Sequence, residues 1–109
     1  MHRVGSVIGI HPEMIEEYKR HHAAVWPRVL AAIHRANIRN YTIFLQEPEN
    51  LLFSSFEYHG ENYAADMARL AADPINPSWL KAVTPCQAPL ETRAEGEHWA
   101  SMQEVFHTD

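Results

Sequence analysis

The chain has 109 residues, of which 46% are hydrophobic and 21% are charged, and its formal net charge is -5. This composition predicts one ordered, soluble domain over residues 1–109 and excludes a disordered chain. Lysine and arginine are scattered along the sequence, so we expect no nucleic-acid partner. No apolar run reaches membrane-spanning length, and the apolar part of residues 1–14 is too short for a signal peptide, so we expect a cytoplasmic protein without membrane contact.

The first third of the chain predicts a strand followed by an interrupted helix. Residues 3–10 (RVGSVIGI) are rich in β-branched side chains, and their two glycines favour a strand that another backbone or a ligand approaches closely. An early proline, acidic residues in the first turns and apolar side chains at helical spacing predict a helix over residues 11–25. Because Pro27 lacks an N–H and clashes with the preceding turn, the helix must kink there or restart and run to residue 37.

The middle of the chain predicts a hairpin and a second helical region. Residues 40–46 (NYTIFLQ) and 51–59 (LLFSSFEYH) have strand-like composition, and the polar turn EPEN joins them as in an antiparallel hairpin. Residues 61–73 place apolar side chains at helical spacing, and Pro74 follows directly. This pattern predicts a helix that ends at residue 73.

The last third of the chain predicts little regular structure before a closing strand. Residues 74–97 hold four of the seven prolines, and only residues 78–83 (SWLKAV) have the pattern of a helical turn. Residues 101–107 (SMQEVFH) predict the final strand. The resulting order β-α-β-β-α-β predicts an α+β, ferredoxin-like fold, with helices on one face of an antiparallel sheet.

The predicted sheet has more apolar surface than one layer of helices can cover. Helices on one face leave the other face of the sheet without a partner, and the strands carry apolar side chains on both faces. We therefore expect a homodimer that packs sheet against sheet. The apolar residues on which this expectation depends are Phe44, Phe53, Phe56, Val105 and Phe106.

The eight histidines and the single cysteine do not have the spacing of a metal site. His21 and His22 are adjacent, so on a helix they point about 100° apart and cannot face one ion. None of the other histidines forms an HxxxH or HxH pair. Cys86 has no second cysteine for a disulfide or a dithiol pair. The sequence therefore predicts no metal site.

Aromatic residues at helical spacing are the best candidates for a functional site. Tyr18, His22 and Trp26 are four residues apart, so they can touch along one helix face. His22 is either a core histidine bonded to a carbonyl or the wall of a pocket, in which it exchanges protons while Tyr18 hydrogen bonds the ligand. Trp26 is expected to be a core anchor, and Tyr41 either ends in solvent or reaches the same cavity. Trp79 is expected in a proline-rich loop with little core to fill, which favours a binding role.

Five segments together resemble the L-rhamnose mutarotase family nearly from end to end: EEYKRHHAAVWP, NYTIFL, NLLFSSFE, WLK and QEVFH. The resemblance implies a dimeric α/β barrel-type assembly of ferredoxin-like chains. It implies interconversion of the α and β anomers of L-rhamnose without metal or organic cofactor. It also implies that His22 is the proton donor and that Tyr18, Tyr41 and Trp79 contact the sugar.

The implied reaction suits these residue types. Mutarotation requires the anomeric hydroxyl to lose a proton while the ring oxygen gains one, and a histidine can exchange protons near neutral pH. The partner base stays open between a tyrosine, a carboxylate such as Glu104, and water. The rival functions are a cofactor-free or haem-handling monooxygenase of the same dimeric fold and a non-catalytic sugar-binding module.

Two features depart from the family's usual pattern. Leu80 stands where the family usually has a second tryptophan, which removes one stacking surface and leaves the exact sugar open. The segment from Thr84 to Ser101 is also longer than in the short family members, and it is expected either to close over the site or to decorate it.

Overall fold

A computed structural model describes residues 1–109, and it contains one antiparallel sheet and four α-helices. The longest helix has ten residues, and no helix combines the length and apolar character needed to cross a bilayer. Short 3-10 turns occupy Pro12–Met14 and Thr84–Cys86. The elements are β1 (His2–Ile10), α1 (Ile15–Ala23), α2 (Pro27–Arg35), β2 (Ile38–Gln46), β3 (Leu51–Tyr58), α3 (Tyr63–Ala72), α4 (Ile75–Val83), β4 (Gln87–Ala88) and β5 (Ala100–Met102).

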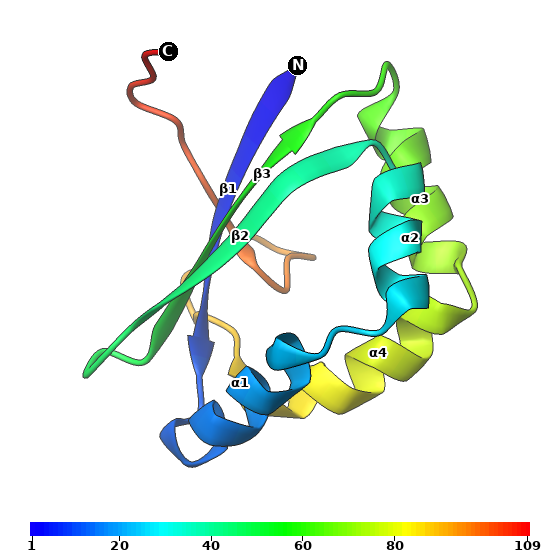
Figure 1. The fold of residues 1–109 in the computed structure, drawn as a ribbon. Helices are drawn as coiled ribbons and strands as arrows, with labels where there is room; N and C mark the ends of the chain where they lie inside the picture. The colour runs from blue at the N-terminus through cyan, green and yellow to red at the C-terminus, as the bar shows by residue number, and fades with distance from the viewer.

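The sheet has the order β2-β3-β1-β4, and β5 also pairs with β1. Every pairing is antiparallel. Figure 1 shows the twisted strands with all four helices on one side of them. The α+β, ferredoxin-like prediction is therefore confirmed, including the hairpin between β2 and β3.

The edge strand beside β1 is divided into two parts by a loop. Gly9 on β1 lies opposite Ala88 of β4, whereas Val7 lies opposite Ala100 of β5. The chain between these two pairs, residues 89–99, therefore leaves the sheet and returns to the same edge. A Cβ atom on Gly9 would lie 2.5 Å from the Ala88 carbonyl oxygen, which confirms the predicted close approach of a backbone.

The core lies between the sheet and its helices. Ile8 and Leu52 face each other across β1 and β3, and both are almost completely buried. Tyr18, Trp79 and Cys86 belong to the same apolar cluster. The helices thus place the predicted aromatic residues against the sheet.

Pro27 divides the first helical region, as predicted. Helix α1 ends at Ala23, and α2 begins with Pro27, whose missing N–H would have no partner in the first turn. Trp26 lies between the two helices in an extended conformation, which is the conformation that a following proline favours. It is 36% exposed, so the prediction of a core anchor on the face of His22 is wrong.

The prediction of irregular structure after residue 73 is partly wrong, because Ile75–Val83 forms the complete helix α4. Pro74 is the N-cap residue, and Pro77 lies in the first turn. The first turn of a helix has N–H groups without intrahelical acceptors, so both prolines are tolerated there. Trp79 therefore lies on a helix and is buried, not in a loop.

The final strand is shorter than predicted. It covers Ala100–Met102, and residues 103–109 have no regular structure. This C-terminal segment leaves the sheet on the side away from the helices (red in Figure 1). Val105 and Phe106 are 88% and 80% exposed, so neither belongs to the core.

The face of the sheet opposite the helices exposes apolar side chains. Phe44 and Phe53 are directly paired across β2 and β3, and Phe53 is also paired with Val7 of β1. Phe44 is 62% exposed and Met102 is 41% exposed. We call this surface, formed by Val7, Phe44, Phe53 and Met102, the open face.

Candidate active site

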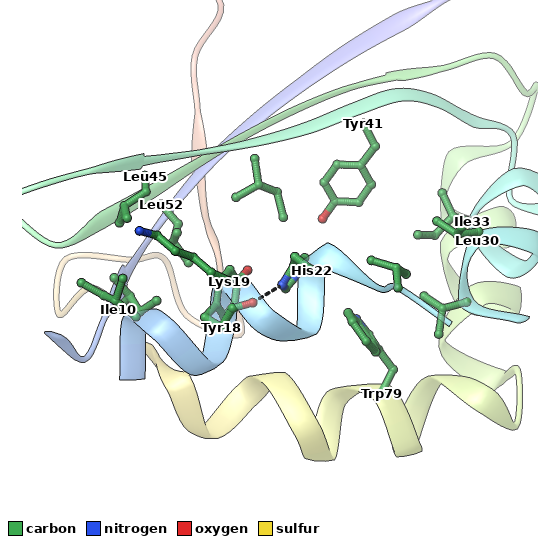
Figure 2. A pocket seen from close by; sticks show the side chains of 14 residues that line it. Ile10, Tyr18, Lys19, His22, Leu30, Ile33, Tyr41, Leu45, Leu52 and Trp79 are labelled. Atoms are coloured by element: carbon green, nitrogen blue, oxygen red, sulfur yellow. Dashed lines mark hydrogen bonds between the residues drawn. The ribbon is translucent and has the colours of Figure 1, made fainter. Parts of the chain in front are cut away.

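A cavity of about 420 Å³ lies between the sheet and helices α1, α2 and α4. Its walls are mainly aliphatic, and polar atoms come from a few side chains (Figure 2). The four predicted site residues all line it. The full lining is Ile10, Ile15, Tyr18, Lys19, His22, Val25, Val29, Leu30, Ile33, Tyr41, Ile43, Leu45, Leu52 and Trp79.

His22 is half-buried in the last turn of α1, and its ring is oriented by the backbone. Its Nδ1 donates a hydrogen bond of 2.9 Å to the carbonyl oxygen of Tyr18, one turn earlier. In the neutral ring, Nδ1 therefore carries the proton and Nε2 has a free lone pair. Burial lowers the pKa of His22, and the neighbouring His21 lowers it further. The hydrogen bond to the Tyr18 carbonyl raises this pKa but does not cancel the effect of burial. His22 is therefore mainly neutral at pH 7, and its Nε2 is a proton acceptor.

Tyr18 lies beside His22 on the same helix face. The two rings are stacked, with centroids 4.2 Å apart and planes 28° apart. Burial raises the pKa of Tyr18 to about 12, although a hydrogen bond from Gln87 acts in the opposite direction. The phenol thus keeps its proton at neutral pH and can donate a hydrogen bond to a ligand.

Tyr41 reaches the cavity because β2 contains a bulge. Arg39 lies opposite Glu57 and Thr42 lies opposite Ser55, so two residues of β2 face one residue of β3 between these pairs. Asn40 has a positive φ of 53°, which permits the bulge. Without the extra residue, Tyr41 would point to the face opposite that of the buried Ile38.

The bulge gives Tyr41 the same orientation as the side chains that follow it on the cavity side of β2. Figure 2 shows its hydroxyl pointing from the sheet toward His22. Tyr41 remains 42% exposed, because the cavity leaves its ring accessible. Burial of the hydroxyl raises the pKa of Tyr41, so this phenol is also protonated at neutral pH.

Trp79 closes the cavity from the side of α4. Its ring meets that of His22 edge to face, with centroids 5.4 Å apart and planes 71° apart. Trp26 packs against Trp79 with centroids 5.3 Å apart. Trp26 therefore supports Trp79 and does not line the cavity itself.

Lys19 is a cavity residue that the sequence analysis did not single out. It follows Tyr18 on α1, and the lining contains no arginine, aspartate or glutamate. Its Nζ lies 3.3 Å from Glu16 Oε2. Nothing in the local pattern EEYKRHH separates this lysine from a solvated one, so only the position of the cavity reveals it.

Two residues considered in the sequence analysis lie elsewhere. Glu104 pairs with Arg3, with Arg3 NH2 3.0 Å from Glu104 Oε1, in a second pocket formed in part by the C-terminal segment. No carboxylate lines the cavity of His22, so within one chain Glu104 is not its partner base. Leu80 is 44% exposed on α4 and does not line the cavity.

No group of three histidine, cysteine, aspartate or glutamate side chains lies close enough to hold a metal ion together. The polar side chains that line the cavity belong to His22, Tyr18, Tyr41 and Lys19, and most of the remaining lining is aliphatic. Together they provide one proton acceptor and several hydrogen-bond donors.

The fold and the cavity define a small ferredoxin-like α+β protein with an aromatic- and histidine-lined cavity under its helices. The comparisons with known structures agree with this fold. The tetracenomycin F2 cyclase of Streptomyces glaucescens has the same fold, with a TM-score of 0.67 at 15% identity over 99% of this chain and 96% of that one. The crystal structure of the L-rhamnose mutarotase of Formosa agariphila has a TM-score of 0.78 at 19% identity and covers 100% of both chains.

The sequence comparisons identify the family. A model of the L-rhamnose mutarotase family matches residues 3–108. The L-rhamnose mutarotase of Oceanobacillus iheyensis is 30% identical over 110 residues and covers 100% of both chains. The chain belongs to the L-rhamnose mutarotase family.

Proposed function

We propose that this protein is an isomerase that interconverts the α and β anomers of L-rhamnose. The observation that carries the proposal is the free Nε2 of His22 inside a cavity of a chain that belongs to this family. A cavity of about 420 Å³ has room for a monosaccharide, and its aliphatic walls suit the C–H face and 6-methyl group of a 6-deoxy sugar.

In the proposed reaction, His22 carries one proton between two oxygens on the same carbon. The neutral Nε2 takes the proton from the anomeric hydroxyl, and the C1–O1 bond becomes the carbonyl of the open aldehyde. The bond between C1 and the ring oxygen breaks, and the imidazolium formed on His22 delivers the proton to that oxygen. Rotation about C1–C2 and the reverse transfers then produce the other anomer, so atoms and protons balance.

This assignment keeps the proton-donor role implied by the family resemblance and adds the role of base. His22 begins as the acceptor because burial keeps it neutral, and it becomes the donor only after the first transfer. No carboxylate lines the cavity to take the first proton. A tyrosinate is disfavoured as the base, since burial raises the pKa of both Tyr18 and Tyr41.

The other three residues are proposed to hold the sugar. Tyr18 and Tyr41 donate hydrogen bonds to its oxygens from opposite walls of the cavity, as their positions in Figure 2 allow. Trp79 covers an apolar face of the ring, where an indole and C–H groups make favourable contact. None of these steps uses a metal or an organic cofactor.

We also propose that a second copy of this chain covers the open face of the sheet. Phe44 and Phe53 present paired aromatic surface there, and a self-complementary apolar patch is typical of a two-fold dimer.

The expected cytoplasmic location stays a prediction from the sequence, and fluorescence microscopy of a tagged chain in the source cells would test it.

Exchange between the anomeric proton signals of sugars, measured by two-dimensional NMR, tests the proposed function. We expect the protein to accelerate exchange strongly for L-rhamnose and less for L-fucose and D-glucose. Binding of L-rhamnose in saturation-transfer spectra without faster exchange would identify a sugar-binding module instead. Oxygen uptake with an aromatic ligand, and no exchange for any sugar, would identify a monooxygenase.

A further inference from the structure

The loop that divides the edge strand brings a histidine to the back of the cavity. Gln87 lies on β4 and is only 7% exposed. It is paired with Ile10, a cavity residue of β1. His98, at the end of the loop, has its Nε2 2.8 Å from Gln87 Oε1. Because a carbonyl oxygen only accepts, His98 donates this hydrogen bond.

The bond from His98 sets the direction of the Gln87 amide. With its oxygen engaged by His98, Gln87 has its NH2 group left as a donor. The buried Tyr18 hydroxyl is the group on which this donor acts, because a hydrogen-bond donor from Gln87 lowers the pKa of that phenol against the effect of burial. A phenol whose oxygen accepts this bond can turn its own proton toward another acceptor. In this cavity, the acceptor available to Tyr18 is an oxygen of the bound sugar.

The loop holds His98 in place from both sides. Glu97 accepts hydrogen bonds from the Ser101 hydroxyl at 2.6 Å and from the backbone N–H of Ala94 at 3.1 Å. Trp99 is packed against the hydrophobic core. A residue between two anchored neighbours has little freedom to leave its partner, so the His98–Gln87 contact is built into the fold.

We propose that Gln87 and His98 are positioning residues, which orient the Tyr18 hydroxyl as a hydrogen-bond donor to the substrate. The role of the substrate rests on the proposed function. The His98–Gln87 hydrogen bond is present in the free protein, and the proposed link from Gln87 to Tyr18 can be tested there without substrate. The loop of residues 89–99 therefore neither covers the site nor decorates the surface. Its proposed role is to orient the Tyr18 hydroxyl, which contacts the substrate.

The free protein provides the first test. In a 1H–15N spectrum, the side-chain NH2 signals of Gln87 are identified by their absence in Gln87→Met. We expect them to shift in Tyr18→Phe and in His98→Ala, and to return close to their wild-type positions in His98→Gln, which retains an N–H donor. Signals that do not move in Tyr18→Phe would overturn the proposal, whether or not the protein is a mutarotase.

Kinetics provide the second test, provided that the wild type exchanges L-rhamnose anomers. Gln87→Met should raise KM about 3- to 10-fold, the loss expected for one neutral hydrogen bond, and change kcat less than about 2-fold. In the Tyr18→Phe background, Gln87→Met should have no further effect on KM. The exposed His34, changed to alanine, is the matched histidine control and should behave as wild type.

An equal rise in KM with and without the Tyr18 hydroxyl would show that Gln87 only stabilises the wall, and the positioning role would be wrong. Absence of exchange in the wild type would instead refute the proposed function and leave the spectroscopic test intact. The two failures are therefore distinguishable.

Discussion

Acidification should switch the enzyme off through His22. Activity requires the neutral ring in the proposed first step, and burial lowers the pKa of His22 below its ordinary value of about 6.5. More than about three quarters of the protein is then in the active form at pH 7, and the neutral fraction falls about tenfold for each pH unit below the pKa. The lowered pKa therefore extends activity to a lower pH than an ordinary histidine would allow.

The assay is kcat/KM for anomer exchange of L-rhamnose between about pH 4.5 and 8, with the buffer-catalysed rate subtracted at each pH. We expect a plateau at neutral pH and a decline on the acid side whose midpoint equals the pKa of His22 measured by 15N NMR in the free protein. The same spectra should show a proton on Nδ1 and none on Nε2 at pH 7. Activity that instead falls as the pH rises through the measured pKa would mean that the resting enzyme needs the imidazolium, and the shuttle would be refuted.

Three further predictions concern assembly and stability. Phe44→Asp should convert the proposed dimer to monomers in sedimentation velocity experiments. Leu80 is exposed on α4, away from the open face, so Leu80→Asp should leave the dimer intact. A monomeric wild type would contradict the proposed assembly. Gly9→Ala should lower the free energy of unfolding by about 1–3 kcal/mol in urea titrations, because its Cβ would meet the Ala88 backbone. Gly5→Ala should cost less, because its Cβ would make ordinary contacts with the flexible end of Met102 and the Ser54 carbonyl oxygen. Equal losses would refute the packing argument. Hydrogen bonds from Tyr58 and Asn37, with Arg69 nearby, lower the pKa of Asp66. The stabilisation that its carboxylate provides should be present above the ordinary carboxyl pKa and lost as the pH falls through the lowered pKa. Asp66→Asn should therefore lose less thermal stability on acidification than wild type.

The local sequence pattern is sufficient to predict one wall of the cavity. Tyr18 and His22 are four residues apart within a single helix, so their contact depends on helical geometry alone. The same rule fails for Trp26, since the helix stops at Ala23 and the spacing no longer has a helical meaning. Pro27 predicts the break in the backbone, and the same break turns the preceding tryptophan away from the face of His22.

The opposite walls depend on information that is not local. Tyr41 enters the cavity because of one extra residue in β2, and a bulge of this kind has no decisive signal in NYTIFL beyond an asparagine that tolerates positive φ. Prolines usually break helices, which favours a loop around Trp79, although Pro74 and Pro77 lie at the start of α4 where they are permitted. Gln87 and His98 meet across a long loop, and only the register of the edge strand on β1 brings them behind Tyr18.

The imidazole of His22 is proposed to move the proton in L-rhamnose mutarotation. The most direct measurement is the anomer exchange rate of L-rhamnose at pH 7 for wild type, His22→Ala and His21→Ala, the last being the adjacent histidine that does not line the cavity. We predict that His22→Ala loses about 10²- to 10⁴-fold in rate while circular dichroism and sugar binding show a folded protein, and that His21→Ala stays near the wild-type rate. A folded His22→Ala protein that retains most of the acceleration would contradict the account.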